Sequence, residues 1–320
     1  SLADSPVDNY PVSTNTQILT AVNLTGSTWP VLTFWDRYAF ADTGDWGWVE
    51  VSTNGSTWIR VYSATLTRTA WARQQIDLSP WKTQPNLRIR FGVSTNYTGV
   101  DDGWYVDELS IQEHPGGGVP LPFFDGFEAP TGTGNWLTSA WAPSPDDPHS
   151  GLLSAASTDN GWISPRSSSA MVLADELDLS VATDPQLTFW LRGGVGDDGG
   201  FAAQVSTDGG VTWATLPGAS IGQYWTSGWT RFQVSLSGYL QSGLRFRLVA
   251  TNGNYGGQSD LYVDDVSVEE MPQPVNLDPA VPFLKSVDLS WSESTLTDFD
   301  HYEVYRSTAA NVTTANDLVF

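Results

Sequence analysis

Few residues in this sequence have the type and spacing that catalysis needs. It holds three histidines and no cysteine, and it lacks a His-Glu-x-x-His motif, so we expect no catalytic zinc. Residues Gly218 to Gly222 fit the Gly-x-Ser-x-Gly pattern of a nucleophilic serine. That motif requires a helix after the serine, and then an acid and a histidine downstream. Strand-like residues follow instead, and the later histidine, His301, belongs to another predicted domain, so we interpret the match as a loop.

A second match, Gly194 to Gly199, has the letters of a dinucleotide-binding loop. Such a loop opens a helix that binds a pyrophosphate, whereas this one opens a predicted strand and carries two aspartates that would repel phosphate. We interpret it as an acidic turn or a second calcium loop. Paired carboxylates can hydrolyse glycosidic bonds, but the aspartates are scattered here and no Glu-x-Asp-x-x-Glu strand is present. We expect a protein without catalytic activity.

The overall charge disfavours two classes of partner. The 320 residues include 14 basic and 36 acidic side chains, for a net charge of −22. A surface this acidic repels the phosphates of nucleic acids and of anionic membranes. No run approaches the roughly 18 apolar residues of a membrane-spanning helix. We therefore expect neither a nucleic-acid partner nor membrane insertion.

The elements that must position any binding residues are repeated along the chain. Leu32 to Trp35 recurs as Leu187 to Trp190, and Tyr105 to Glu108 recurs as Tyr262 to Asp265. The other matched segments keep the same order, with offsets between 154 and 158 residues. Nearly every matched segment alternates apolar and polar residues, as a half-buried strand does. The repeat predicts two similar all-β domains, each built of two antiparallel sheets packed as a sandwich.

Glycine- and proline-rich segments divide the chain. We expect one sandwich over residues 1–113, a linker over 114–120, a second sandwich over 121–270 and part of a third β-domain over 271–320. The second repeat has 33 residues, Leu121 to Leu153, ahead of the position that aligns with Ser1. The first sandwich therefore lacks an opening strand, which leaves an open edge and an uncovered core. Either the sequence is a piece of a longer chain, or a neighbouring chain supplies the strand, as in donor-strand assemblies.

These segments resemble known families. Phe124 to Glu128, followed by Trp136 and closed by Tyr262 to Val266, resembles the MAM-like jelly-roll module of immune-inhibitor-A-type secreted metallopeptidases and large bacterial surface proteins. Residues 275–320 resemble the first half of a fibronectin type III domain. The resemblance implies two tandem jelly-roll β-sandwiches, part of an immunoglobulin-like sandwich, and a secreted or cell-surface location.

The resemblance also implies calcium. In MAM-like modules the opening acidic motif and the closing aspartate pair lie close together and commonly hold a structural Ca²⁺ ion. Carried over, the ligands are Asp125, Glu128 and Asp265, with Asp264 less favoured because alternation puts the two aspartates on opposite faces of a strand. In the first repeat, Asp107 and the residue after it match. The alternative is that all of these are solvated acids at strand ends.

Binding side chains are harder to identify. We expect most tryptophans to fill the cores, and we consider Trp104, Trp141 and Trp162 as exposed ligand contacts because they lie near predicted loops. The arginine pairs at 88 and 90 and at 245 and 247 predict either a face that binds an acidic glycan or a solvated face. The candidate glycosylation sites are Asn23, Asn54, Asn96 and Asn311.

The leading interpretation is a non-catalytic, extracellular structural or adhesive array within a larger secreted or surface protein. Such an array would be stabilised by calcium, would contact other copies of itself or neighbouring domains, and could form a fibre or coat. The alternative is a carbohydrate- or protein-binding accessory region of a secreted peptidase.

Overall fold

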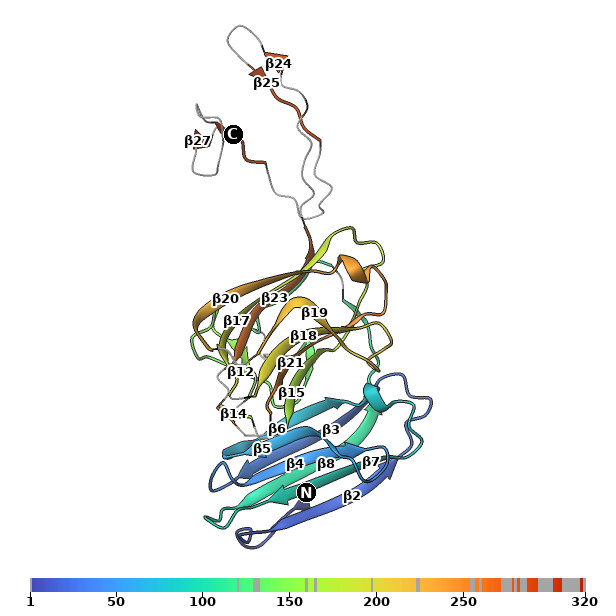
Figure 1. The fold of residues 1–320 in the computed structure, drawn as a ribbon, viewed down its shortest axis with the longest axis vertical. Coiled ribbons are helices and arrows are strands. Elements are labelled where there is room, and N and C mark those ends of the chain that lie inside the picture. Colours follow the sequence, from blue (N-terminus) through green and yellow to red (C-terminus); the bar gives the residue numbers. More distant parts are fainter. Residues whose placement is uncertain are drawn as a thin grey trace. The chain divides into compact units, whose positions relative to one another are not determined.

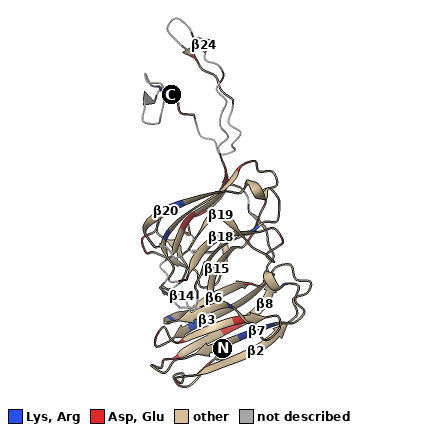
Figure 2. Ribbon diagram, in the orientation of Figure 1, with Lys and Arg blue, Asp and Glu red and all other residues tan. Residues whose placement is uncertain are grey.

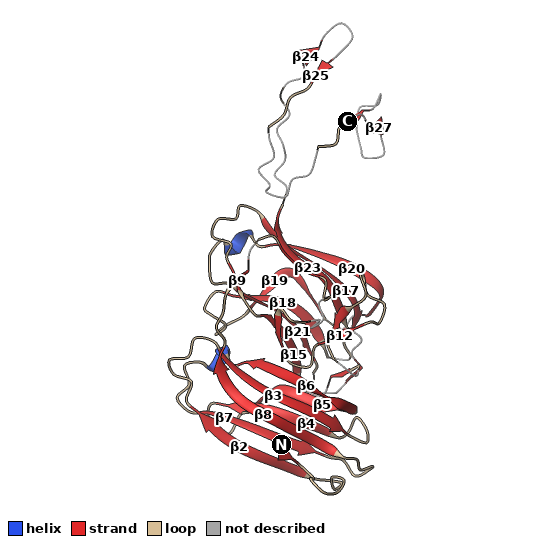
Figure 3. Ribbon diagram, turned by 180° about the vertical axis from the view of Figure 1, so that it is seen from behind, coloured by secondary structure: helices blue, strands red, loops and turns tan. Residues whose placement is uncertain are grey.

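A computed structural model of the chain gives its fold. It describes residues 2–119, 121–128, 133–158, 161–163, 166–196, 198–222, 225–253, 257–258, 261–271, 278, 281–282, 287–292, 302–306 and 317–318. Contacts group the chain into two units, Ser1–Glu269 and Glu270–Phe320. The prediction of an all-β fold is confirmed, since the helices of the described part are two three-residue 3₁₀ turns (Figure 3). No helix in this part is long and apolar enough to cross a membrane.

The first unit begins with sandwich 1, which consists of two four-stranded antiparallel sheets (Figure 1). One sheet has the order β1 (Leu2–Ala3), β8 (Gly103–Glu113), β3 (Pro30–Ala39), β6 (Thr67–Asp77). The other has the order β2 (Asn15–Val22), β7 (Leu87–Ser94), β4 (Trp46–Ser52), β5 (Ile59–Thr65). A 3₁₀ turn, η1 (Ser79–Trp81), follows β6.

Sandwich 2 follows in the same unit and repeats this plan with additional strands. Its first sheet has the order β12 (Ala142–Ser144), β13 (Ser154–Ala156), β23 (Tyr262–Glu270), β17 (Pro185–Gly194), β20 (Trp225–Ser235), and β10 (Phe123–Asp125) also pairs with β23. Its second sheet has the order β11 (Trp136–Thr138), β15 (Ser168–Leu173), β21 (Arg245–Thr251), β18 (Gly200–Ser206), β19 (Ala214–Ile221). A short pair joins β14 (Trp162–Ile163) to β22 (Gly257–Gln258), and the turn η2 (Ser237–Tyr239) follows β20.

The segment predicted as a linker is itself structured. Within it, β9 (Gly118–Val119) runs parallel to β16 (Glu176–Leu177) of sandwich 2. His114 packs edge-on against Trp29 of sandwich 1, and its Nε2 lies 2.6 Å from the carbonyl oxygen of Ala174 in sandwich 2. The connection is therefore held by both sandwiches.

Apolar side chains from both sheets fill each sandwich, as the alternation predicts. The core of sandwich 1 includes the fully buried Phe34, Tyr62 and Leu87, and that of sandwich 2 includes Phe127 and Phe189. Charged residues are sparse along the strands (Figure 2). The sandwiches thus have ordinary hydrophobic cores, and the sites of interest lie at their edges and where they meet.

The second unit is described only in part. It contains β24 (Val281–Pro282) paired with β25 (Val287–Asp288), and β26 (Tyr305–Arg306) paired with β27 (Asp317–Leu318). Most of the predicted half of a fibronectin type III domain falls outside the described residues, as does the sequon at Asn311.

Candidate functional site

The two sandwiches are joined by polar contacts. Arg245, on β21, donates from Nη1 to Ser79 Oγ at 2.7 Å, and its guanidinium lies 3.6 Å from the centre of the Trp29 ring. Lys82, just after η1, donates to the carbonyl oxygen of Gly209 at 2.9 Å. Arg245 is buried. Because a buried guanidinium without partners is costly, these contacts fix the junction.

A cleft of about 380 Å³ lies at this junction. We call it the junction cleft. Its walls come from β5, β6 and η1 of sandwich 1, and from β11, β15, β21 and the β18–β19 hairpin of sandwich 2. Strands β11 and β15 lie beside β6 and β5 respectively, and Figure 1 shows β15 next to these strands of sandwich 1. Neither sandwich could form the cleft alone.

Two tryptophans, Trp81 and Trp213, line the junction cleft, and both are partly buried. The ring of Trp213 is held by a hydrogen bond from Nε1 to the carbonyl oxygen of Gly210 at 3.1 Å. The Arg247 guanidinium lies 4.2 Å from the centre of the same ring. Aromatic rings fixed in this way present an apolar surface with a polar rim.

The hairpin that carries Trp213 is stabilised by its own turn. Asp208 accepts hydrogen bonds from the N–H and hydroxyl of Thr212 at 2.9 and 2.6 Å. Burial disfavours ionisation of Asp208, but its hydrogen bonds outweigh this effect and lower its pKa to about 2. Gly209 and Gly210 have φ of 67° and 85°, a region that favours glycine. The carboxylate of this Asp-Gly-Gly turn therefore stabilises the turn itself.

The polar side chains of the junction cleft include Asp77, Gln75 and Arg247. Asp77 Oδ1 accepts from the N–H and hydroxyl of Ser79 at 2.9 and 2.5 Å. Its Oδ2 is buried and has no hydrogen-bond partner among the described residues. Burial raises the pKa of Asp77, and the Ser79 hydrogen bonds and the charge of Arg245 oppose the rise. Burial lowers the pKa of Arg247 to about 10, against the attraction of Asp77.

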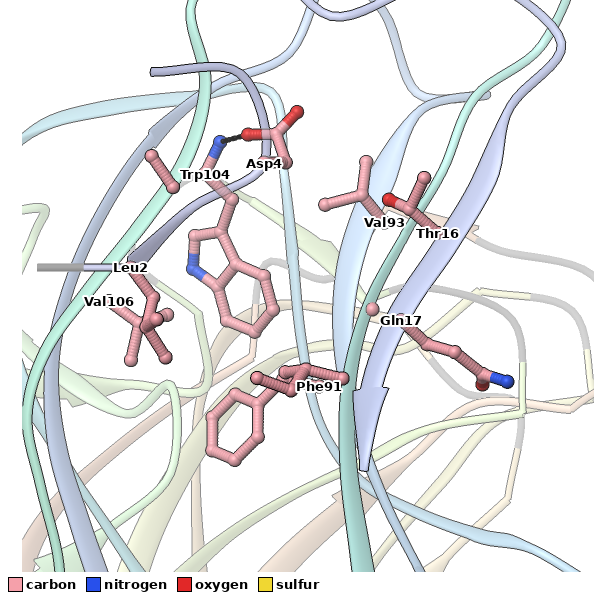
Figure 4. A pocket seen from close by; sticks show the side chains of 11 residues that line it. Leu2, Asp4, Thr16, Gln17, Phe91, Val93, Trp104 and Val106 are labelled. Carbon is pink, nitrogen blue, oxygen red and sulfur yellow. Dashed lines mark hydrogen bonds between the residues drawn. The ribbon is translucent and has the colours of Figure 1, made fainter. Parts of the chain in front are cut away.

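A second cavity, of about 250 Å³, opens at one edge of sandwich 1, and we call it the edge cleft. It lies between β1 and β8 of one sheet and β2 and β7 of the other. Figure 4 shows the Trp104 ring standing along it, with Leu2 and Val106 on one side and Val93 on the other. The lining is mainly apolar, and the Asp4 carboxylate there accepts from the Trp104 N–H at 2.7 Å.

A buried carboxylate fixes the Trp104 wall of the edge cleft. Asp36 accepts hydrogen bonds from Trp104 Nε1 at 3.0 Å, from the Tyr62 hydroxyl at 2.6 Å and from Gln74 at 3.0 Å, and it pairs with Arg68. Burial raises the pKa of Asp36, and the charge of Arg68 opposes this rise. Tyr62, Gln74 and Arg68 hold the Asp36 carboxylate in place. Its hydrogen bond from Nε1 therefore holds the ring of Trp104 in one orientation.

The expectation that the three loop-proximal tryptophans are exposed is wrong for two of them. Trp104 and Trp141 are each only 4% exposed, because their side chains turn into the sandwich interiors although their sequence neighbours form loops. Trp104 nevertheless lines the edge cleft. Trp162 lies on the short strand β14 and is partly buried.

The acids proposed for calcium accept hydrogen bonds from the protein. Asp125 accepts from the N–H of Phe127 at 2.8 Å, from Asn135 at 2.9 Å and from Trp136 Nε1 at 2.8 Å. Glu128 accepts from two backbone N–H groups, those of residues 152 and 153, at 2.8 Å each. Asp107 is exposed and accepts from the next backbone N–H. Among the residues that the structure describes, no group of three or more His, Cys, Asp or Glu side chains is placed to hold a metal ion.

The two closing aspartates correct the alternation argument. Asp264 accepts from the N–H groups of His149 and Ser150 at 2.9 and 3.2 Å, while Asp265 contacts the His149 ring at 2.6 Å and the Ser150 hydroxyl at 2.8 Å. Both therefore face the same loop. The reason is the backbone at Asp265, where φ is 47°, which interrupts the strand alternation; Glu108, its counterpart in sandwich 1, has φ of 50°.

The described sequons differ in environment. Asn23 and Asn54 are exposed, and their side-chain oxygens cap local turns. Asn96 is partly buried, and its Nδ2 donates to Asp42 at 2.8 Å, so a glycan there would compete with this bond. Glycosylation remains a prediction.

The sequence pattern identifies only part of the junction cleft. Arg247 belongs to an arginine pair that predicted either a face for an acidic glycan or a solvated face, whereas Trp81 and Gln75 had no predicted role. The signal available was the arginine pair at 245 and 247, which interrupts an otherwise apolar strand. Its meaning depends on how two folded domains meet, and a strand pattern does not contain that information.

Comparisons with known proteins identify no family. No family model and no curated protein matches the chain. Among solved structures, the N-terminal CBM22-1–CBM22-2 tandem domain from Paenibacillus barcinonensis Xyn10C is 14% identical, with a TM-score of 0.31, over 78% of this chain and 82% of that one. A carbohydrate-binding module of the β-sandwich superfamily is 10% identical, with a TM-score of 0.34, over 81% and 100%. The PBSX exported protein XepA is 9% identical, with a TM-score of 0.23, over 82% and 84%. At such low TM-scores these likenesses carry no argument about what this chain binds.

Proposed function

We propose that this chain is a non-catalytic extracellular binding module, and that the junction cleft holds a segment of a neutral glycan. The observation that carries the proposal is the combination, in one cleft of about 380 Å³, of two tryptophans with Asp77, Gln75 and Arg247. Sugar rings have apolar C–H faces that suit aromatic surfaces, and hydroxyl groups that suit convergent polar side chains.

The charges favour a neutral ligand. The net charge of −22 repels acidic polysaccharides over the whole surface. Within the cleft, Gln75 and Arg247 are partly buried, so their polar groups are accessible to the hydroxyl groups of a ligand. Such hydroxyl groups form hydrogen bonds without adding charge.

Affinity electrophoresis tests the proposal. The full chain is run through native gels that contain soluble arabinoxylan, β-glucan, galactan or amylose. We expect at least one of them to retard the chain, and Trp81→Ala to weaken this binding at least tenfold. Trp71→Ala removes an exposed tryptophan of β6 outside the cleft and serves as the matched control. If no polysaccharide retards the chain, or if both variants bind like the original, the junction cleft is not a glycan site.

The place of this module in a larger assembly is also part of the proposal. We infer that the module belongs to a secreted or cell-surface array that contacts neighbouring domains or other copies of itself. The polar docking of the two sandwiches, centred on Arg245, supports this role because it makes one unit of two domains.

Calcium also remains a proposal. The oxygens of Asp125, Glu128 and Asp265 already accept protein donors, so an ion would add to this arrangement or rearrange it. The proposal expects EDTA to lower the melting temperature and added Ca²⁺ to restore it. An unchanged melting temperature would contradict the calcium proposal.

A further inference from the structure

Corresponding positions of the two sandwiches differ sharply in exposure. Ile18 on β2 corresponds to Met171 on β15. Ile18 pairs with Phe91, and Met171 pairs with Leu248, which is the counterpart of Phe91 in sandwich 2. Ile18 is 54% exposed, whereas Met171 is fully buried. Leu109 on β8 is 43% exposed, while its counterpart Val266 on β23 is fully buried. Sandwich 1 therefore lacks a cover that sandwich 2 has.

In sandwich 2 the cover is the segment from β10 to β11. Strand β10 pairs with β23 at the level of Val266, and β11 pairs with β15 at the level of Met171. Phe127, which follows β10, and Trp136, the first residue of β11, are buried in the core between the two sheets. These strands and side chains thus close the edge of the sandwich.

In sandwich 1, no described strand takes the places that β10 and β11 have in sandwich 2. Within the described residues, β2 pairs only with β7. On the side of β8 away from β3, the described pairing joins Tyr105 and Val106 to β1. The edge cleft lies between these two edges and is lined by Phe91, Trp104 and Ile18. An unpaired strand edge beside an apolar groove is the arrangement to which an added strand binds.

The outer face of the sheet that contains β17, β20 and β23 gives an independent indication that sandwich 1 lacks a cover. In sandwich 2, Arg192 lies 5.4 and 4.4 Å from the ring centres of Trp229 and Tyr262, and His149 stacks at 3.8 Å on Trp190. The loop of His149 follows β12 and covers this face, and Trp229 Nε1 donates to the carbonyl oxygen of Asp147 at 3.1 Å.

Sandwich 1 repeats the stack without a described loop over it. Arg37 lies 5.6 and 4.1 Å from the ring centres of Trp71 and Tyr105, and Trp71 is 41% exposed. In sandwich 1, the edge cleft and the outer face therefore both lack a described cover. In sandwich 2, the corresponding cover comes from residues just before β13.

We propose that sandwich 1 is a docking site for a polypeptide segment of the β10–β11 type, which adds one strand to the free edge of β8 and one to that of β2. The segment has a Phe-x-Asp-x-Phe motif followed by a tryptophan, as residues 123–127 and 136 do. Its backbone satisfies the unpaired edge groups, and its aromatic side chains fill the edge cleft. The Asp of the motif orients the Phe and the Trp, as Asp125 does through Phe127 N–H and Trp136 Nε1.

A labelled peptide with the sequence of Leu121 to Thr138 tests this inference on the full chain. We expect saturable binding by fluorescence anisotropy. A peptide with the two changes Phe127→Ala and Trp136→Ala should bind at least tenfold more weakly. In the chain, Ile18→Lys places a charge at the mouth of the edge cleft and should weaken binding at least tenfold. Val7→Lys, at a 90% exposed position outside the cleft, should leave it unchanged.

The same variants define the contrary results. Circular dichroism first establishes that Ile18→Lys and Val7→Lys fold like the original. Absence of peptide binding to the folded chain overturns the proposal. Binding that Ile18→Lys leaves unchanged also overturns it, because the peptide would then have exchanged into sandwich 2. A homodimer that Ile18→Lys dissociates, without peptide binding, would identify a second copy as the occupant and likewise contradict the proposal.

Discussion

At the scale of single residues, the buried carboxylates of this protein serve as hydrogen-bond acceptors that hold other groups in place. Asp36 orients Trp104, and Asp125 orients Phe127 and Trp136. Asp264 is fully buried and accepts three backbone N–H groups, those of residues 149, 150 and 265. A buried carboxylate lowers stability unless its donors compensate for lost hydration. Burial raises the pKa of Asp36 and of Asp264, so these two acids make the fold sensitive to pH.

Asp264 makes this sensitivity measurable. Burial raises its pKa from 3.8 to about 6, against the lowering effect of its backbone donors. A raised folded-state pKa means that its stabilising contribution is complete below about pH 4 and is lost as pH rises through about 6. The full shift corresponds to at most about 3 kcal/mol. We expect the Asp264→Asn variant to be less stable overall, but to lose the fall in stability that ionisation of Asp264 causes. This fall is measured as the difference in urea midpoint between pH 4 and pH 7. An equal fall in both proteins would contradict the assignment.

At the scale of elements, the crossover from β10 to β11 depends on Asp125. Asp125→Ala leaves the Trp136 Nε1–H and the Phe127 N–H without their acceptor, each at a cost of about 1–3 kcal/mol. We therefore expect the free energy of unfolding to fall by roughly 2–6 kcal/mol, measured by denaturant titration. Asp8→Ala removes an exposed acid of sandwich 1 and should change stability by less than about 0.5 kcal/mol. Similar losses in the two variants would show that Asp125 does not hold the crossover.

The strands could be predicted from sequence because alternation and repetition are local signals. The segments around Phe34 and Phe189 are recognisable in this way, and both lie in buried strands. The shared facing of Asp264 and Asp265 could not be predicted, since a positive φ at a non-glycine residue leaves no trace in the alternation. Trp141 was misjudged for a related reason: proximity to a loop along the chain does not fix where a side chain points.

At the scale of the whole molecule, the junction between the sandwiches is the feature that sequence patterns could not reveal. It depends on Arg245, which contacts Ser79, Trp29 and Glu176 from a buried position. Arg245→Ala would remove the hydrogen bond to Ser79, the contact with the Trp29 ring and the ion pair with the partly exposed Glu176.

We therefore expect Arg245→Ala to uncouple the two sandwiches. Calorimetry should show one transition for them in the original protein and two in the variant. Arg231→Ala, an exposed arginine on β20, is the matched control and should keep the single transition. A single transition in Arg245→Ala would mean that other contacts suffice to couple the domains.

The contact of Lys82 with the hairpin has a practical consequence for chemical labelling. The sequence contains only two lysines, Lys82 and Lys285. The Lys82 ammonium donates to the carbonyl oxygens of Gly209 and Asp208 at 2.9 and 3.3 Å. An amine-reactive ester should therefore acylate Lys82 slowly while the sandwiches are docked and quickly once they separate. In Arg245→Ala the rate should rise, so mass spectrometry of one tryptic region would report the opening of the junction without any attached probe.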